Sequence, residues 1–250
     1  MSQVASDTLL GIFLIFCRIG GCMLIAPAFS SNRIPPQVRL FLALTVSLAL
    51  APVLMDKIRT GIAGQAPTVT LTWIGTEMLV GLLIGLLGRV YFLALQTMLS
   101  AVSMAIGYGG MPGTPIDEAE PLPAISSLIM MVATAVIFLS DLHWELFRGL
   151  IASYSRVPVG QGFAVQTSLT ELVDQVGVAF VLALRISSPF LIYSVIVNLV
   201  AGLTNKLTPQ IPVFFIATPF VMFGGLFVMY FAAQDYVLLF IEAFTAWLRD

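Results

Sequence analysis

The sequence is short of charged residues: Asp, Glu, Lys and Arg make up 10% of its 250 residues. A water-soluble domain carries about 25% of them, because a water-facing surface needs charge. Hydrophobic residues make up 59% of the chain and the mean hydropathy is +1.01, which excludes an ordinary soluble fold. A total of 11 basic residues provides no footprint for nucleic acid. The surroundings of most of this chain are therefore lipid or other protein.

Residues that carry catalytic or metal chemistry are also scarce. The one histidine, His143, stands between Asp141 and Glu145 in a polar break. We interpret it as part of an interfacial turn, with a metal ligand or proton sensor as the alternative. Cys17 and Cys22 lie too far apart along one helical run to bridge, so we expect packing roles. Phosphate-binding loops, zinc-binding histidine pairs and nucleophile turns are missing, which predicts a non-enzyme without cofactor or metal.

What the sequence does have is long apolar runs. They cover residues 8–29, 38–55, 69–106, 122–140, 171–204, 207–233 and 236–248. Lipid offers no partner to a peptide group, and the alternation of a membrane barrel is missing, so the runs predict helices. Run 69–106 is long enough for nearly two crossings or for one long helix. We predict an all-α membrane protein with six to eight helical segments.

The basic residues contradict a simple zigzag through the membrane. Arg33 and Arg39 lie in one connection, and Lys57 and Arg59 lie in the next. A single crossing between them would place basic loops on both sides, against the tendency of Lys and Arg to stay cytoplasmic. Some segments are therefore expected to be hairpins or half-crossings buried in neighbouring subunits.

Isolated glycines and charges interrupt the apolar runs. Gly81 and Gly85 share a helix face with Glu77, and such small residues let two helices approach closely, within the chain or between subunits. An unpaired charge in an apolar run is costly, so we expect pairing with each other or with partner subunits. A proton or ion path is the alternative. The charges in question are Arg18, Glu77, Arg89 and Arg185.

Segment 107–123 is too rich in glycine and proline for a regular helix. It is either a disordered connector or a functional plug. Ile106, Tyr108 and Met111 make its first half too apolar for a solvated linker, so we favour a loop held against other protein. Nearer the carboxyl end, a polar turn from Asn205 to Pro212 predicts a helical hairpin. Pro189 lies inside the helix before this turn and should kink that helix.

Four blocks of residues carry a resemblance to a known family. They are Arg18 with Ala26-Pro27, Ile34-Pro35, Val38 to Leu40 and Ala51-Pro52; Glu77 with Gly81, Gly85, Gly107 and Gly110; His143 with Pro158 to Gly160; and Arg185, Pro189, Asn198 and Gly202 with the turn Asn205 to Gln210. In this order and at these separations they resemble the FliR family of flagellar export-gate proteins and its virulence-type counterparts in injectisomes.

The resemblance implies a subunit of a type III export gate in the bacterial inner membrane, at the flagellar basal body. Its implied partners are FliP and FliQ in one helical complex, FlhB, and the unfolded flagellar proteins that are exported. The implied fold is a set of kinked helical hairpins in a helical hetero-oligomer, partly above the membrane plane. Residues 1–160 would be similar to FliP and residues 161–250 to FliQ.

The resemblance also implies roles for single residues. A pore plug is expected at Ile106, Gly107, Tyr108, Gly109, Gly110, Met111, Pro112, Gly113 and Asp117. Packing between helices or subunits is expected at Arg18, Glu77, Gly81, Gly85, Arg185, Pro189, Asn198, Lys206, Pro209 and Gln210. Many relatives end the plug with Asp-Pro and carry phenylalanines, whereas this chain has Tyr108, Met111 and Asp117-Glu118.

Two other functions compete with a gate. A secondary transporter of a small solute also uses broken helices and buried charges, although an inverted repeat and clustered midplane ligands are missing here. A purely structural assembly seed would differ from a gate only in lacking contact between Tyr108 or Met111 and a translocating chain.

Overall fold

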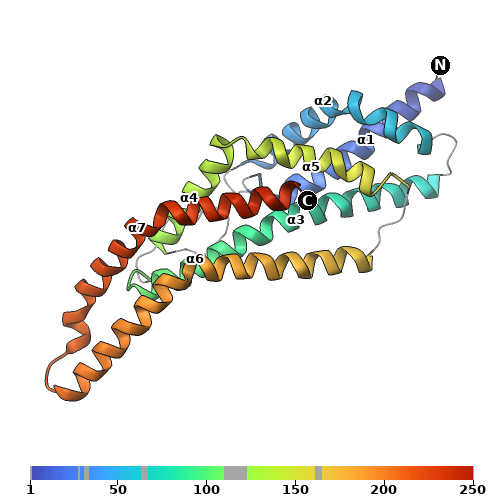
Figure 1. Cartoon of the computed structure of the whole chain (residues 1–250). Helices are drawn as coiled ribbons and strands as arrows, with labels where there is room; N and C mark the ends of the chain where they lie inside the picture. The colour runs from blue at the N-terminus through green and yellow to red at the C-terminus, as the bar shows by residue number, and fades with distance from the viewer. Residues whose placement is uncertain are drawn as a thin grey trace. The chain divides into compact units, whose positions relative to one another are not determined.

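A computed structural model of the chain describes residues 2–27, 29–30, 34–62, 67–109, 123–160 and 165–249. These residues form seven helices (Figure 1): α1 (Ser2–Ile25), α2 (Pro36–Ile62), α3 (Pro67–Ala105), α4 (Ala124–Leu139), α5 (Leu142–Arg156), α6 (Val165–Leu207) and α7 (Val213–Arg249). By length and composition, five could cross a membrane, or up to six spans if the bent pair α4 and α5 counts as one. The predicted all-α membrane protein is confirmed.

The chain divides into two compact units. Unit 1 comprises Met1–Val90, Phe138–Gln175 and Leu248–Asp250, and unit 2 comprises Tyr91–Ile137 and Val176–Trp247. Unit 1 therefore contains α1, α2, α5 and the first part of α3, whereas unit 2 contains most of α6 and α7.

Proline and glycine set several helix ends. Pro36 and Pro67 occupy the first positions of α2 and α3, where a missing N–H costs nothing. Gly107, just past the last residue of α3, has φ +85° and so adopts the left-handed conformation that favours glycine. The Tyr108 N–H donates to the Ser103 carbonyl at 2.8 Å, and the Gly107 N–H donates to Met104 at 3.2 Å. These two backbone hydrogen bonds form a Schellman motif at the C-terminal end of the helix.

Helices α4 and α5 are two halves of a pair bent by 69°. Asp141, with φ +56°, forms the bend, and His143 is the second residue of α5 directly after it. The apolar runs did not predict α5, because only one face of this helix is apolar. Leu142, Leu146 and Leu150 recur every four residues on the buried side, which is the spacing of an amphipathic helix.

The long helices differ from the predicted segments in two places. Residues 207–233 and 236–248 were expected as separate runs, but α7 continues through Gln234 and Asp235. Both side chains are exposed, so they interrupt the apolar pattern without disturbing the backbone hydrogen bonds. Helix α2 likewise extends to Ile62, beyond the predicted end at residue 55. Run 69–106 is one long helix, α3.

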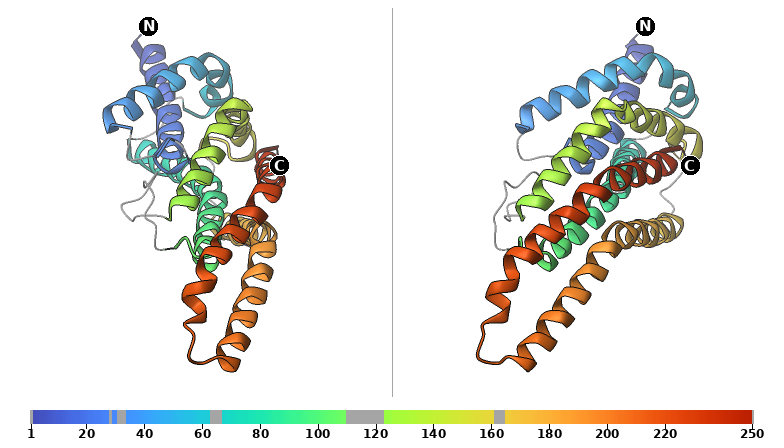
Figure 2. Two further views of the ribbon diagram at one scale, coloured as in Figure 1. Left: turned by 90° about the vertical axis from the view of Figure 1, so that its left-hand side faces the viewer. Right: turned by 60° about the vertical axis from the view of Figure 1, so that its left-hand side comes forward.

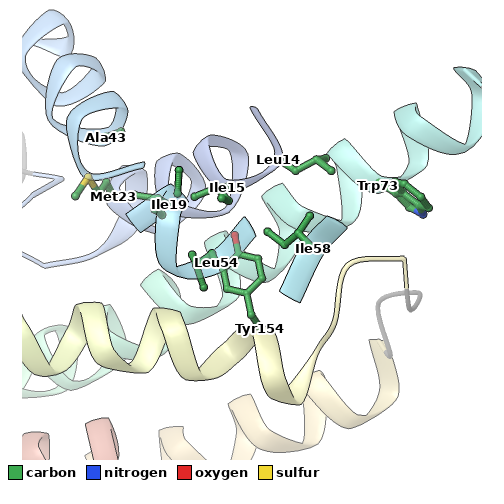
Figure 3. Packing of buried hydrophobic residues seen from close by; sticks show 10 residues of the cluster. Leu14, Ile15, Ile19, Met23, Ala43, Leu54, Ile58, Trp73 and Tyr154 are labelled. Carbon is green, nitrogen blue, oxygen red and sulfur yellow. The ribbon is translucent and has the colours of Figure 1, made fainter. Parts of the chain in front are cut away.

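The core of unit 1 lies where α1 and α2 pack side by side, with α3 and α5 adding one residue each. Figure 3 shows Tyr154 of α5 directed toward Leu54 and Ile58 of α2. The buried cluster comprises Leu14, Ile15, Ile19, Met23, Ala43, Ala51, Leu54, Ile58, Trp73 and Tyr154. Residues of four helices, α1, α2, α3 and α5, are thereby held together.

In unit 2, α6 and α7 run antiparallel and are joined by residues 208–212, which confirms the predicted hairpin (Figures 1 and 2). The Tyr193 hydroxyl donates to the Val221 carbonyl at 2.9 Å, and the rings of Phe190 and Tyr236 are 5.6 Å apart. Pro189 lies inside α6 without ending it. The Asn198 amide donates to the Ser194 carbonyl one turn earlier, at 2.8 Å.

The ends of α3 and α4 meet at a hydrogen bond between Ser103 and Ser126, whose hydroxyl oxygens are 2.9 Å apart in a buried site. Cysteines at both positions should therefore form a disulfide on mild oxidation, since sulfur atoms placed there can reach bonding distance. The measurement uses a Cys17→Ala and Cys22→Ala background with a protease site inserted between residues 110 and 122. The cleaved chain should run as one band until it is reduced.

Ser100, one turn earlier on α3, gives the matched control: Ser100→Cys with Ser126→Cys should leave two fragments without reduction. Two fragments from the Ser103 and Ser126 cysteine pair would contradict the closure of this connection at its base.

Candidate functional site

The strongest polar feature of the structure is an ion pair inside unit 1. Arg18 of α1 is 0% exposed and Glu77 of α3 is 2% exposed. The Arg18 Nε atom donates to Glu77 Oε2 at 2.6 Å, and its Nη2 atom donates to Glu77 Oε1 at 2.8 Å. Two parallel charge-assisted bonds are the strongest geometry available to these groups.

Helix α5 and its C-cap residue supply further hydrogen-bond acceptors for the guanidinium. Arg18 Nη1 donates to the Ser153 hydroxyl at 3.0 Å, and Nη2 also donates to the Val157 carbonyl at 2.9 Å. The Tyr154 ring covers the guanidinium carbon at 3.8 Å from the ring centroid, in a cation–π arrangement. Every nitrogen of this buried cation therefore has an acceptor, which is the condition under which a buried ion pair is tolerated.

Glycines bring α1 and α3 close enough for this pair. A Cβ atom on residue 81 would collide with the backbone carbonyl of Arg18 itself. On residue 85 it would lie 2.5 Å from the Cys22 carbonyl oxygen, and on residue 21 it would lie 2.7 Å from that of Met78. Gly21, Gly81 and Gly85 thus line a backbone-to-backbone contact between two helices of the same chain.

The other expected packing residues lie apart from this network. Arg89 Nη1 is 3.5 Å from the Ser30 hydroxyl. Arg185 is exposed on α6, and its guanidinium forms no ion pair with any residue that the structure describes. At the hairpin turn of unit 2, Lys206, Pro209 and Gln210 are all exposed.

The expected plug lies only partly within the described residues. Ile106 is fully buried, Tyr108 is half-buried, and Gly107 and Gly109 complete the described part. The remaining positions, Gly110, Met111, Pro112, Gly113 and Asp117, lie outside the described residues. Where side chains are described, no group of three or more His, Cys, Asp or Glu could hold a metal ion.

Sequence reasoning missed two sets of contact residues. Ser153, Tyr154 and Val157 were not identified, because α5 was not expected to be a helix. Gly224 and Gly225 of α7 were also missed, although an adjacent glycine pair inside an apolar run is a usable signal of close packing.

These features define a polytopic helical membrane protein whose buried charges hold helices together. Residues 9–247 match the family described as bacterial export proteins, family 1. Similar proteins include the flagellar biosynthetic protein FliR of Caulobacter vibrioides, 27% identical over 217 residues, which cover 85% of this chain and 84% of the relative. FliR of Escherichia coli is 24% identical over 238 residues (92% and 88%), and FliR of Aquifex aeolicus is 27% identical over 231 residues (92% and 88%).

The chain therefore belongs to the FliR family of bacterial export proteins. It is a component of the flagellar type III export apparatus, and proteins of this family are non-enzymatic membrane components.

Gly81→Ala should reduce the stability of unit 1 by about 1–3 kcal/mol or more, because α1 and α3 must separate to admit the methyl group. Gly75→Ala is the matched control on the same helix, since a Cβ atom there meets nothing within 4 Å. The control should be neutral or slightly stabilising, as Ala favours a helix. The measurement is the thermal midpoint of the purified protein in detergent, and equal midpoints for the two variants would refute this contact.

Glu77→Ala should cost about 3–5 kcal/mol, because it leaves the buried Arg18 cation without its counter-charge. Replacing both partners by Met should cost less, since no uncompensated charge remains. The same thermal midpoint measures both variants. A double variant as unstable as Glu77→Ala would mean that lost packing, and not the uncompensated charge, causes the instability.

Proposed function

We propose that this chain is a pore-forming subunit of the flagellar export gate. It assembles with FliP and FliQ and cooperates with FlhB, and unfolded flagellar proteins cross the bacterial inner membrane through the resulting channel. The driving energy comes from elsewhere, since the family is non-enzymatic.

The observation that carries this proposal is the surface of the α6 and α7 hairpin. Large apolar side chains are exposed along both helices of this hairpin, among them Phe180, Val195, Leu199, Phe215, Phe220, Phe223 and Tyr230. In the same unit, Arg185 is exposed within an apolar candidate span and forms no ion pair with the described residues. A cation in such a position needs a protein partner or water, because hydrocarbon offers it neither. Sister subunits around an aqueous channel would supply both.

The two-part resemblance fits this assembly. Helices α6 and α7 lie wholly within residues 161–250, the part proposed to be FliQ-like. A helical hairpin with apolar residues on many faces can pack against neighbouring hairpins in a ring, and such packing would allow part of the assembly to stand above the membrane plane.

The connection after α3 is proposed as the plug of the channel. Ile106 and Tyr108 stand at its start, and Met111 and the glycines around it make the sequence apolar and rich in glycine. Apolar side chains can seal a narrow channel against ions by excluding water, and flexible ones can be pushed aside by a polypeptide.

Co-expression tests the assembly. A tag on this chain should recover FliP and FliQ in one complex that is visible by electron microscopy. Recovery of a stable, monodisperse single chain that binds a small solute would instead support a secondary transporter.

Deletion of residues 107–113 tests the plug. The assembled gate should then conduct ions in planar bilayers or leak them in cells, because its seal is lost. A replacement of the same seven positions by Gly and Ser keeps the length and should also leak, since it removes the apolar side chains. Unchanged conductance in both variants, with the complex intact, would argue against the plug.

A further inference from the structure

The base of the α3–α4 connection sits on the glycine pair of α7. A Cβ atom on Gly225 would lie 2.6 Å from the Ile106 Cβ, 2.8 Å from its Cγ2 and 3.3 Å from its Cδ1. Ile106 is fully buried and Gly225 is buried, so the contact is closed to solvent. The side chain of Ile106 thus occupies the space that any larger residue at position 225 would need.

The next residue continues this contact. Gly107 has φ +85°, and a Cβ atom there would lie 3.2 Å from the Met222 Cγ, one turn before Gly225 on α7. The Schellman motif of α3 therefore ends directly against α7. On the other end of the connection, the buried bond from Ser103 to Ser126 holds the start of α4 to the end of α3.

The neighbouring glycine ties the same place to α6. A Cβ atom on Gly224 would collide with the Tyr193 hydroxyl, which donates to the Val221 carbonyl at 2.9 Å. Of the two adjacent glycines, Gly225 thus packs against Ile106 and Gly224 packs against Tyr193. A shift of the α6 and α7 hairpin would move the contact that holds the end of α3.

We propose that Met222 and Gly225 form a seat for Ile106 and Gly107 that positions the base of the plug and sets its closed state. This inference rests on the proposed function of the α3–α4 connection. Residues of the seat act through the plug and need no contact with the exported chain, so they are positioning residues.

Gly225→Ala fills the seat and should displace Ile106. The expected result is an increase of about tenfold in the ion conductance of the assembled gate without substrate, which corresponds to about 1.4 kcal/mol between closed and open states. Gly202→Ala on α6 is the matched control, because a Cβ atom there meets nothing within 4 Å. Recovery of FliP and FliQ on the tagged chain must equal that of the wild type in both variants.

A compensating change separates positioning from general damage. Ile106→Gly removes all three atoms that the new methyl group would meet, including the closest one, the Ile106 Cβ. In the Gly225→Ala background it should therefore lower the conductance toward the wild-type value, although Ile106→Gly alone empties the seat and should itself leak. If Gly225→Ala prevents assembly, Met222→Ala makes the same test, because it shortens the seat without adding bulk and should also leak.

The outcomes distinguish the seat from the plug. Leak after deletion of residues 107–113 but wild-type conductance in Gly225→Ala would overturn the seat and leave the proposed function standing. Wild-type conductance in both would overturn the two together. Equal leak in Gly225→Ala and in the double variant would also overturn the seat, because the effect would not pass through Ile106.

Discussion

The packing of the helices in unit 1 depends on the buried ion pair of Arg18 and Glu77. A protein with so little charge keeps an ionised pair in its interior only if each nitrogen of the cation finds an acceptor. Two bonds from α1 to α3 and two from α1 to α5 and its C-cap residue, Val157, meet that condition. The pair therefore fixes three helices at once, and any sliding of one past another would break charge-assisted bonds that lipid cannot replace.

The ion pair and the glycines depend on each other. Gly81 lies against the carbonyl of Arg18, one turn of α3 after Glu77. Apolar association is weak between helices in lipid, so close backbone packing supplies the contact and the ion pair supplies the register. Unit 2 repeats the device at Gly224 and Gly225, where the partners are Tyr193 and Ile106 instead of a charge.

Hydropathy predicted the fold class because long apolar runs must be helical in lipid, and it predicted the α6 and α7 hairpin from one polar turn. It failed at α5, whose apolar residues recur only on one face, and at Asp235, whose exposed carboxylate does not interrupt α7. The candidate charges were identified from cost alone. The sequence could not predict which of these charges pair, because Arg18 and Glu77 are 59 residues apart and the remaining acceptors come from α5, which was not expected to be a helix.

The two units differ in how they accommodate a cation within an apolar helix, and this difference bears on assembly. In unit 1, groups of the same chain accept hydrogen bonds from the buried Arg18 guanidinium, so this cation needs no partner subunit to be satisfied. In unit 2, Arg185 remains exposed within an apolar helix, and the large side chains around the hairpin are exposed as well. Because an isolated cation and broad apolar faces are together costly in either water or lipid, unit 2 is the part whose stability should depend most on neighbouring subunits. The proposed plug begins at Ile106, which packs on Gly225 of that same hairpin, so the proposed packing of the hairpin against sister subunits would also fix the position where the plug begins.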